Sequence, residues 1–314
     1  MNFGQTIKNE IINRPIKDDE EKKYFLLGII RGAGSLFSKD EEIGLDISLS
    51  DELTAMTVSN YLNTLFNYEV REVSVTEDRL NKKDKFVLSV VGDKALEVLE
   101  LLKILVTDEE GSKVNFDFYG DALKDERYFK AFIRGLFISS GVCTVPDFEN
   151  DKTKYHLELS FSHNNTAFST LEQLEKFGIK SKITRRKDEF ILYIKSAEEI
   201  KDFLAFLPVP VSVIKLSDVI VKREFINEVN RRKNCDLGNV NRQIEASRKV
   251  LNAIEKIEKT MGLNSLKDDL YVVAKARQNN PEETMVELAE RLNISKSCLN
   301  HRLRKIISIA NEEE

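Results

Sequence analysis

One segment of this 314-residue chain occurs twice, and this duplication constrains the fold more than any other feature. Residues 24–36 read YFLLGIIRGAGSL and residues 128–143 read YFKAFIRGLFISSGVC, so that Gly28 aligns with Gly135 at an offset of 107 positions. Each copy is followed by the same order of apolar patterns, some with the period of a helix and others with that of a strand. We therefore expect an α+β domain made of two similar halves related by a pseudo-twofold axis.

The order of elements expected in each half is helix, two strands, helix, two strands, helix. In the first half we expect a strand at 45–50, a helix at 53–66, the last strand of a hairpin at 86–90 and a final helix at 94–105. In the second half we expect the same four elements at 157–162, 166–177, 190–194 and 197–207. The first half is expected to occupy residues 1–110 and the second residues 111–210.

Residues 26–34, LLGIIRGAG, and 133–141, IRGLFISSG, resemble two degenerate copies of the LAGLIDADG helix of homing endonucleases. The resemblance implies that small residues let the two helices pack at unusually short range. It also implies that an acid at the eighth position of each copy holds a catalytic metal ion. The small residues expected at this structural interface are Gly28, Gly32, Gly135 and Ser139.

The eighth positions of the two copies are Ala33 and Ser140, which supply no carboxylate. A hard divalent cation prefers anionic oxygen ligands. We therefore expect an inactive endonuclease-like domain, with no catalytic residues, no metal site and no other cofactor. The alternative is a metal-dependent homing-type endonuclease with displaced acidic ligands, for which Asp40 and Glu41 are the candidates nearest in sequence.

Residues 284–306 have the pattern of a helix-turn-helix. Thr284, with Glu287 three residues later, predicts a capping box at the start of the first helix. Asn293 is one of the few residue types that tolerates a positive φ in the turn, and Ser295 is expected to cap the second helix. The apolar residues expected to face inward are Val286, Leu288, Ala289 and Leu292 on the first helix and Leu299, Leu303 and Ile306 on the second.

The second helix has no acidic residue from Lys296 to Lys305, and its polar side chains suit the reading of a DNA groove. Asn300 and Arg304 are expected to read bases, whereas Arg302 and Lys305 are expected to contact phosphates. The predicted DNA-binding set is Thr284, Ser295, Lys296, Ser297, Asn300, His301, Arg302, Arg304 and Lys305. The alternatives are a helical hairpin with a solvated basic face and an adaptor whose second helix contacts protein.

A duplicated endonuclease-like domain followed by a helix-turn-helix is similar to the WhiA family of bacterial regulators. Residues 231–241, RRKNCDLGNVN, look like that family's junction signature, and residues 296–305, KSCLNHRLRK, look like its recognition helix. The resemblance spans nearly the whole chain. It implies a sequence-specific DNA-binding transcriptional regulator, linked to sporulation in some bacteria and to cell division or chromosome segregation in others.

Pro208 and Pro210 predict a boundary after the duplicated domain, because proline lacks an N–H and disfavours helix in the preceding residue. Gly262 is expected to end a later helix. The rest of the chain is expected to comprise a linker helix (211–235) and an all-α helix-turn-helix bundle (236–314), with helices over 211–232, 240–261 and 265–279 before the helix-turn-helix.

Two further basic stretches are candidates for auxiliary DNA or partner contact. One lies on the hairpin of the second half and the other in the linker; together they comprise Lys182, Arg185, Arg186, Lys187, Arg231, Arg232 and Lys233. A charged hairpin also discourages strand pairing at a sheet edge, and a basic linker also serves as a solvated hinge. Both interpretations stay open for each stretch.

Composition limits where DNA contact can arise and where the protein works. The net charge of −5 requires any DNA contact to come from local basic patches. The three cysteines form no C-x-x-C pair, which is typical of a reduced cytosolic protein. Without an apolar signal core or a run of 18 apolar residues, we expect a cytoplasmic, nucleoid-associated protein that does not contact membranes. Its expected partners are double-stranded DNA and a protein bound through the N-terminal domain.

Overall fold

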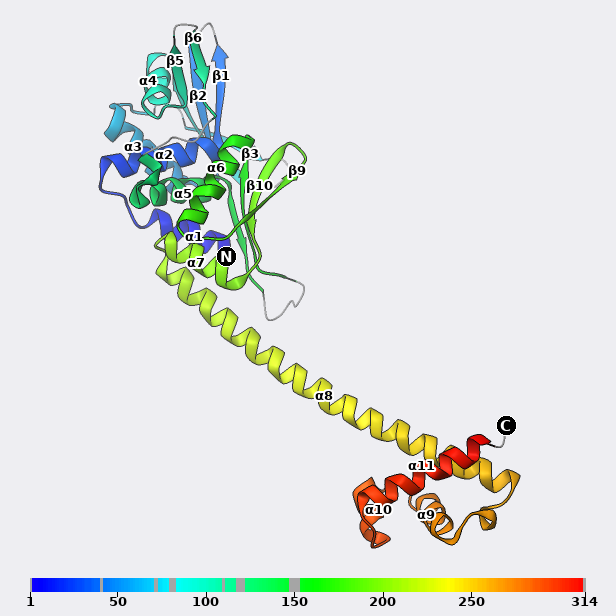
Figure 1. The fold of residues 1–314 in the computed structure, drawn as a ribbon. Helices are drawn as coiled ribbons and strands as arrows, with labels where there is room; N and C mark the ends of the chain where they lie inside the picture. Colours follow the sequence, from blue (N-terminus) through cyan, green and yellow to red (C-terminus); the bar gives the residue numbers. More distant parts are fainter. Residues whose placement is uncertain are drawn as a thin grey trace. The chain divides into compact units, whose positions relative to one another are not determined.

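The computed structural model describes residues 2–39, 42–70, 73–78, 83–108, 111–116, 122–146 and 153–312. The chain divides into two compact units, Met1–Arg223 and Glu224–Glu314 (Figure 1). Each unit has its own hydrophobic core. The boundary between the units falls within helix α8 (Pro210–Thr260).

The first unit contains the same succession of elements twice, in the order expected from the sequence. The first half consists of α2 (Asp19–Ala33), β1 (Gly34–Lys39), β2 (Glu42–Leu49), α3 (Glu52–Phe66), β3 (Val73–Asp78), β4 (Lys83–Val91) and α4 (Asp93–Leu101). The second consists of α5 (Glu126–Ser140), β7 (Gly141–Thr144), β8 (His156–Phe161), α6 (Asn164–Lys176), β9 (Lys182–Arg186), β10 (Glu189–Ile194) and α7 (Ala197–Phe206). Helix α1 (Phe3–Ile12) precedes both halves, and β5 (Leu105–Asp108), β6 (Gly111–Val114) and the 3-10 helix η1 (Ala122–Lys124) join them.

Each half has a four-stranded antiparallel sheet with the same strand order. The order is β1-β2-β4-β3 in the first half and β7-β8-β10-β9 in the second. Leu45 and Ile47 of β2 and Leu157 and Leu159 of β8 are fully buried on one face of their sheets. Because side chains alternate along a strand, Glu158 lies on the opposite face, which we call the outer face. The α+β fold with pseudo-twofold repetition is therefore confirmed.

Helices α2 and α5 lie side by side at the centre of the first unit (Figure 1), and their backbones are in direct contact. A Cβ atom built on Gly28 would lie 2.1 Å from the carbonyl oxygen of Phe132, and one built on Gly135 would lie 2.1 Å from that of Phe25. The two contacts are equivalent in the two halves, because at the offset of 107 residues Gly28 aligns with Gly135 and Phe25 aligns with Phe132. Glycine is required because no side-chain movement relieves a clash with a backbone atom.

The aligned positions Gly32 and Ser139 face each other across the same helix pair. The Ser139 hydroxyl lies 3.3 Å from the carbonyl oxygen of Gly28 and 3.1 Å from that of Gly135 in its own helix. A Cβ atom on Gly32 would lie only 2.0 Å from the Ser139 hydroxyl oxygen. The serine therefore fits because its counterpart in the other half has no side chain.

Helix α1 connects the helix pair to the start of α8. Arg134 of α5 is only 8% exposed, and its guanidinium donates to the carbonyl oxygens of Ile11 and Arg14. The Glu10 carboxylate accepts hydrogen bonds from the backbone N–H groups of Val211 (2.8 Å) and Ser212 (2.9 Å). An acid at this end of a helix satisfies N–H groups that have no partner within the helix and complements the helix dipole.

The expected end of one helix and the expected break within another are wrong. Helix α4 ends at Leu101 rather than at Leu105, because the chain takes a positive φ of 55° at Lys103 and then enters strand β5. The helices expected over 211–232 and 240–261 are one helix, α8. Its only proline, Pro210, is its first residue, where a missing N–H is harmless. The interior Gly238 disfavours helix by only about 1 kcal/mol relative to alanine.

The second unit is all-helical. It contains the rest of α8, the 3-10 helix η2 (Leu263–Ser265), α9 (Asp268–Asn279), α10 (Met285–Arg291) and α11 (Lys296–Glu312). Gly262 ends α8 with a φ of 76°, as expected. The expected start of the next helix at Ser265 is wrong, since the Ser265 hydroxyl donates to the carbonyl of Gly262 and Lys267 occupies the N-cap of α9. Within the described ranges, no helix is both long and apolar enough to cross a membrane.

We predict that leucine at Gly28 or Gly135 destabilises the first unit. The substitution overpacks the contact between α2 and α5 and should lower the free energy of unfolding by about 1–3 kcal/mol or more. Thermal unfolding of the full-length variants, followed by circular dichroism, measures this loss. Gly238→Ala is the control, because a Cβ atom there meets only the Arg242 guanidinium at 3.8 Å. Wild-type melting of either leucine variant would contradict the proposed role of the glycines.

Candidate nucleic-acid interface

A capping box begins helix α10. The Thr284 hydroxyl accepts a hydrogen bond from the Glu287 N–H at 3.3 Å, and the Glu287 carboxylate accepts one from the Thr284 N–H at 2.7 Å. This reciprocal pair satisfies donors at the helix start that have no partner within the helix. The capping box predicted from the sequence is confirmed. Because of it, the Thr284 hydroxyl is hydrogen-bonded to the backbone of its own helix.

The turn between α10 and α11 has the conformation expected from its sequence. Asn293 has a φ of 54°, and the Ile294 N–H donates to the carbonyl of Ala289 at 3.0 Å. The Ser295 hydroxyl then accepts from the Cys298 N–H at 3.1 Å, so Ser295 caps α11. These local bonds fix where α11 begins and therefore which of its side chains face the core.

Helix α11 has one buried and one exposed face. The buried face comprises Leu299, Leu303, Ile306 and Ala310, which pack in the core of the second unit with Leu288 and Ala289 of α10. Val286, which the sequence analysis placed in the inward stripe of α10, is 48% exposed. That expectation is wrong, because the helix is rotated so that Leu288 and Ala289 are the buried pair.

The exposed face of α11 contains most of the predicted DNA-binding set. Lys296, Ser297, Asn300, His301, Arg304 and Lys305 are all exposed, and no carboxylate occurs between Lys296 and Lys305. Arg302 differs from them: its side chain is 27% exposed and its Nε lies 3.5 Å from the Asp269 carboxylate of α9. The structure thus presents a continuous polar and basic surface in which Arg302 is held at the edge.

The basic side chains of the hairpin β9–β10 lie on both faces of its sheet. Arg185 lies with its guanidinium 5.8 Å from the centre of the Phe190 ring, and Lys187 occupies the turn with a φ of 56°. Arg186 points to the outer face, where it pairs with Glu158 at 3.2 Å, and Lys182 shares that face by strand alternation. The four residues are all exposed but do not form one surface.

The second auxiliary stretch, Arg231, Arg232 and Lys233, lies within α8. All three residues are exposed, and Arg232 pairs with Glu228 at 2.7 Å. Successive residues of a helix point about 100° apart, so three neighbours do not share one face. The stretch is helical throughout, and both expected roles, a solvated hinge and an auxiliary contact, stay predictions.

The two positions where LAGLIDADG enzymes carry acids lie at the C-terminal ends of α2 and α5. Ala33 ends α2, and Ser140, which ends α5, donates its hydroxyl to the carbonyl of Leu136 at 3.2 Å. Within the part of the chain that the structure describes, no group of three His, Cys, Asp or Glu side chains is arranged to hold a metal ion. Asp40 and Glu41 lie outside the described residues.

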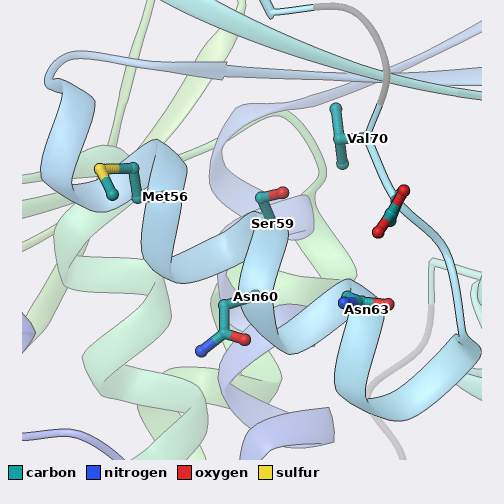
Figure 2. Close-up of a pocket in the computed structure, with 6 residues that line it drawn as sticks. Met56, Ser59, Asn60, Asn63 and Val70 are labelled. Atoms are coloured by element: carbon teal, nitrogen blue, oxygen red, sulfur yellow. The ribbon is translucent and has the colours of Figure 1, made fainter.

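A shallow cavity of about 470 Å³ lies against α3 (Figure 2). It is lined by Met56, Ser59, Asn60, Asn63, Glu69 and Val70. These side chains offer amides, a hydroxyl and one carboxylate but no cation. The lining therefore lacks the lysine and arginine side chains that neutralise nucleic-acid phosphates.

Two acids stabilise the start of the helix-turn-helix and make its stability depend on pH. The hydrogen bonds from Thr284 lower the pKa of Glu287, and the hydrogen bonds from Arg291 lower the pKa of Glu283. A carboxyl whose pKa is lower in the folded state contributes stability above its unfolded pKa of about 4.3. This contribution is lost as the pH falls through the lowered, folded-state pKa.

We therefore predict that Glu287→Gln lowers the melting temperature of the second unit at pH 7, and that the difference from wild type shrinks as the pH falls below about 4. Glutamine preserves the hydrogen-bonding shape of the capping box, so the charge alone is tested. Glu290→Gln, an exposed position of α10 outside the capping box, is the control. A difference that is the same at both pH values would contradict the role of the Glu287 charge.

Comparison with known proteins covers almost the entire chain. Family models match at residues 19–105 (WhiA N-terminal LAGLIDADG-like domain), 129–226 (WhiA LAGLIDADG-like domain) and 229–310 (WhiA C-terminal HTH domain). The chain is 31% identical to the probable cell division protein WhiA of Staphylococcus haemolyticus, over 99% of this chain and 97% of that protein. It is 32% identical to the protein of the same name from Clostridium novyi, over 99% and 98%.

Among solved structures, the full-length WhiA (DUF199) protein of Thermatoga maritima superposes with a TM-score of 0.58 at 28% identity. The superposition covers 99% of each chain, so both the duplicated domain and the helix-turn-helix have counterparts there. The resemblance inferred from the sequence motifs is confirmed. The chain belongs to the WhiA family.

Proposed function

We propose that this protein is a sequence-specific DNA-binding transcriptional regulator linked to cell division, chromosome segregation or sporulation. Of these three roles, the names of its relatives support cell division. The observation that carries the proposal is the exposed face of α11, where Asn300, Arg304 and Lys305 lie in a segment, Lys296–Lys305, that contains no carboxylate. A helix held this way across a second helix can place its N-terminal half in the major groove.

The architecture of the second unit supports this role. The capping box, the Asn293 turn and the Ser295 cap fix α11 through backbone hydrogen bonds, so its exposed side chains start from a rigid support. Contacts with bases near the start of α11 supply specificity, and Lys305 near its middle supplies a phosphate contact. Thr284 and Ser295 then act by positioning the two helices, because each caps the start of its helix.

The endonuclease-like unit is proposed to be catalytically inactive and to serve as a surface for a protein partner or for auxiliary DNA contact. Ala33 and Ser140 have no anionic oxygen to offer a divalent cation, and the Ser140 hydroxyl is bonded to its own helix. The auxiliary candidates in this unit are Lys182 and Arg186 on the outer face and Arg185 and Lys187 beside them. Localisation at the nucleoid follows from this proposal.

We predict distinct effects for variants of α11 in the full-length protein. Asn300→Ala and Arg304→Ala should each lose about 1–3 kcal/mol of discrimination at one base pair. Lys305→Ala should weaken all duplexes alike and reduce the slope of log K against log salt by about 1. Chromatin immunoprecipitation identifies the operator, and gel shifts on operator and random duplexes at several salt concentrations then measure these effects.

Lys259→Ala is the matched control, because Lys259 is an exposed lysine of the second unit that lies on α8 and pairs with Glu255. It should leave DNA binding unchanged. Arg302→Ala tests the edge of the interface, since its pairing with Asp269 predicts a smaller loss than for Lys305→Ala. Equal losses for all variants on operator and random duplexes would refute the assignment of base-reading and phosphate-binding roles.

We also predict that the purified protein leaves supercoiled plasmid intact when incubated in excess with Mg²⁺ or Mn²⁺. The reason is the absence of a carboxylate at positions 33 and 140. Gel electrophoresis of the plasmid over time measures nicking. Metal-dependent nicking that co-purifies with the protein and disappears in Asp40→Asn or Glu41→Gln variants would instead support the endonuclease with displaced acids.

A further inference from the structure

Helix α8 presents a row of exposed apolar side chains within the second unit. Ile226, Leu237, Val240 and Ile244 are each 43–60% exposed. In the part of the chain that the structure describes, no residue of α8 from position 224 to position 249 is buried. An exposed helix is usually polar on all sides, so this row has the composition of a surface that another molecule covers.

The exposed apolar residues share one face of α8. Successive residues of a helix point about 100° apart, and at that angle eight positions fall within an arc of about 80°. Six of the eight are apolar, and one, Lys233, is charged. The ion pair of Arg232 with Glu228 lies outside this arc. We call this face the α8 stripe; its positions are Ile226, Val229, Lys233, Leu237, Val240, Ile244, Ser247 and Leu251.

The α8 stripe is distinct from the face by which α8 joins the core of the second unit. Four buried residues further along the helix pack in that core. They point roughly 110° away from the centre of the stripe, so the core covers one face of α8 and leaves the stripe open. Most of the stability of a protein helix comes from packing of its apolar face. The four core residues are Val250, Ala253, Ile254 and Ile257.

The spacing along the α8 stripe is that of a coiled coil. From Leu237 to Leu251 its positions alternate at intervals of three and four residues, which is the heptad pattern. From Ile226 to Leu237 the spacing is 11 residues, a heptad with four residues inserted, which a coiled coil accommodates by local unwinding. The whole stripe runs for about 38 Å and about three and a half heptads, a length typical of coiled coils.

The pattern of the α8 stripe fits a second copy of the same stripe running in the opposite direction. When two copies are centred midway between Leu237 and Val240, each Leu237 lies opposite Val240 of the other copy. In the same arrangement Ile226 lies opposite Leu251, so apolar residues meet at the centre and at both ends. Every such contact occurs twice, as a twofold interface between identical surfaces requires.

The one charge on the stripe selects this orientation. A parallel pair would place Lys233 beside Lys233 of the other copy, where like charges repel. The antiparallel pair places Lys233 opposite Ile244, which the aliphatic part of the lysine can cover while its ammonium stays in water. Val229 lies opposite Arg248, whose aliphatic part can cover it in the same way.

We propose that the α8 stripe binds the α8 stripe of a second copy of this chain, as an antiparallel two-stranded coiled coil over residues 226–251. The interface gives α8 the packing that its apolar face lacks within one chain. The resulting dimer has two copies of α11. Dimerisation does not depend on DNA binding by α11, so either property can fail without the other.

Sedimentation velocity of the full-length protein in a dilution series tests the proposal, because self-association depends on concentration. We expect a species of twice the chain mass that dissociates on dilution. Val240→Glu should raise the dissociation constant about tenfold or more, since it places a charge against Leu237 of the other copy. Val272→Glu is the matched control, because Val272 of α9 lies outside the stripe and is 51% exposed, against 50% for Val240. It should dimerise like wild type.

Cysteine cross-linking tests the orientation of the two helices. Two variants, Lys233→Cys and Ile244→Cys, are made in a chain with Cys235→Ser and Cys298→Ser, because both native thiols are at least partly exposed. A disulfide forms only between closely placed Cβ atoms. An equal mixture of the two variants should therefore oxidise to a covalent dimer, whereas Lys233→Cys alone should stay uncrosslinked.

Three outcomes would overturn the proposal. Wild-type protein that stays monomeric at every concentration would leave the stripe to a different partner. Equal dimerisation of wild type and Val240→Glu would place the interface elsewhere on the chain. Cross-linking of Lys233→Cys to itself would show a parallel pair. Circular dichroism checks that each variant is folded, and the wild-type dilution series needs no variant at all.

Discussion

The structure of the first unit depends on the backbone contact between α2 and α5. Gly28 and Gly135 let each helix approach the carbonyl groups of the other, and each helix runs directly into the first strand of its sheet, at Gly34 and Gly141. The helix pair therefore sets the positions of both sheets. Arg134, which is part of the same pair, holds α1 in place, and α1 in turn caps α8 through Glu10.

The sequence predicted those parts of the structure that local signals specify. The duplication predicted two similar halves, and the capping box, the turn asparagine and the serine cap predicted the helix-turn-helix. The prediction failed at α8, where two helices, 211–232 and 240–261, were expected and one continuous helix is found. Helix ends depend on small energy differences: a single glycine in a helix interior disfavours it by about 1 kcal/mol, which the surrounding helix-forming residues outweigh.

The candidate sites differ in how far a sequence can reveal them. The exposed face of α11 arises from one continuous segment, so helical periodicity was sufficient to predict Asn300, Arg304 and Lys305 as exposed. Val286 was misplaced because four apolar residues of a short helix are compatible with more than one rotation, and only packing selects one.

The pairing of Gly32 with Ser139 shows what a covalent duplication permits. In a symmetric dimer of identical chains, these aligned positions would hold the same residue, so that serine would face serine or glycine would face glycine. The first pair would clash, since even a bare Cβ opposite Ser139 would lie 2.0 Å from its hydroxyl, and the second would lose the serine's hydrogen bonds. Fusion into one chain freed the halves to become complementary, and neither half can now be replaced by a copy of the other.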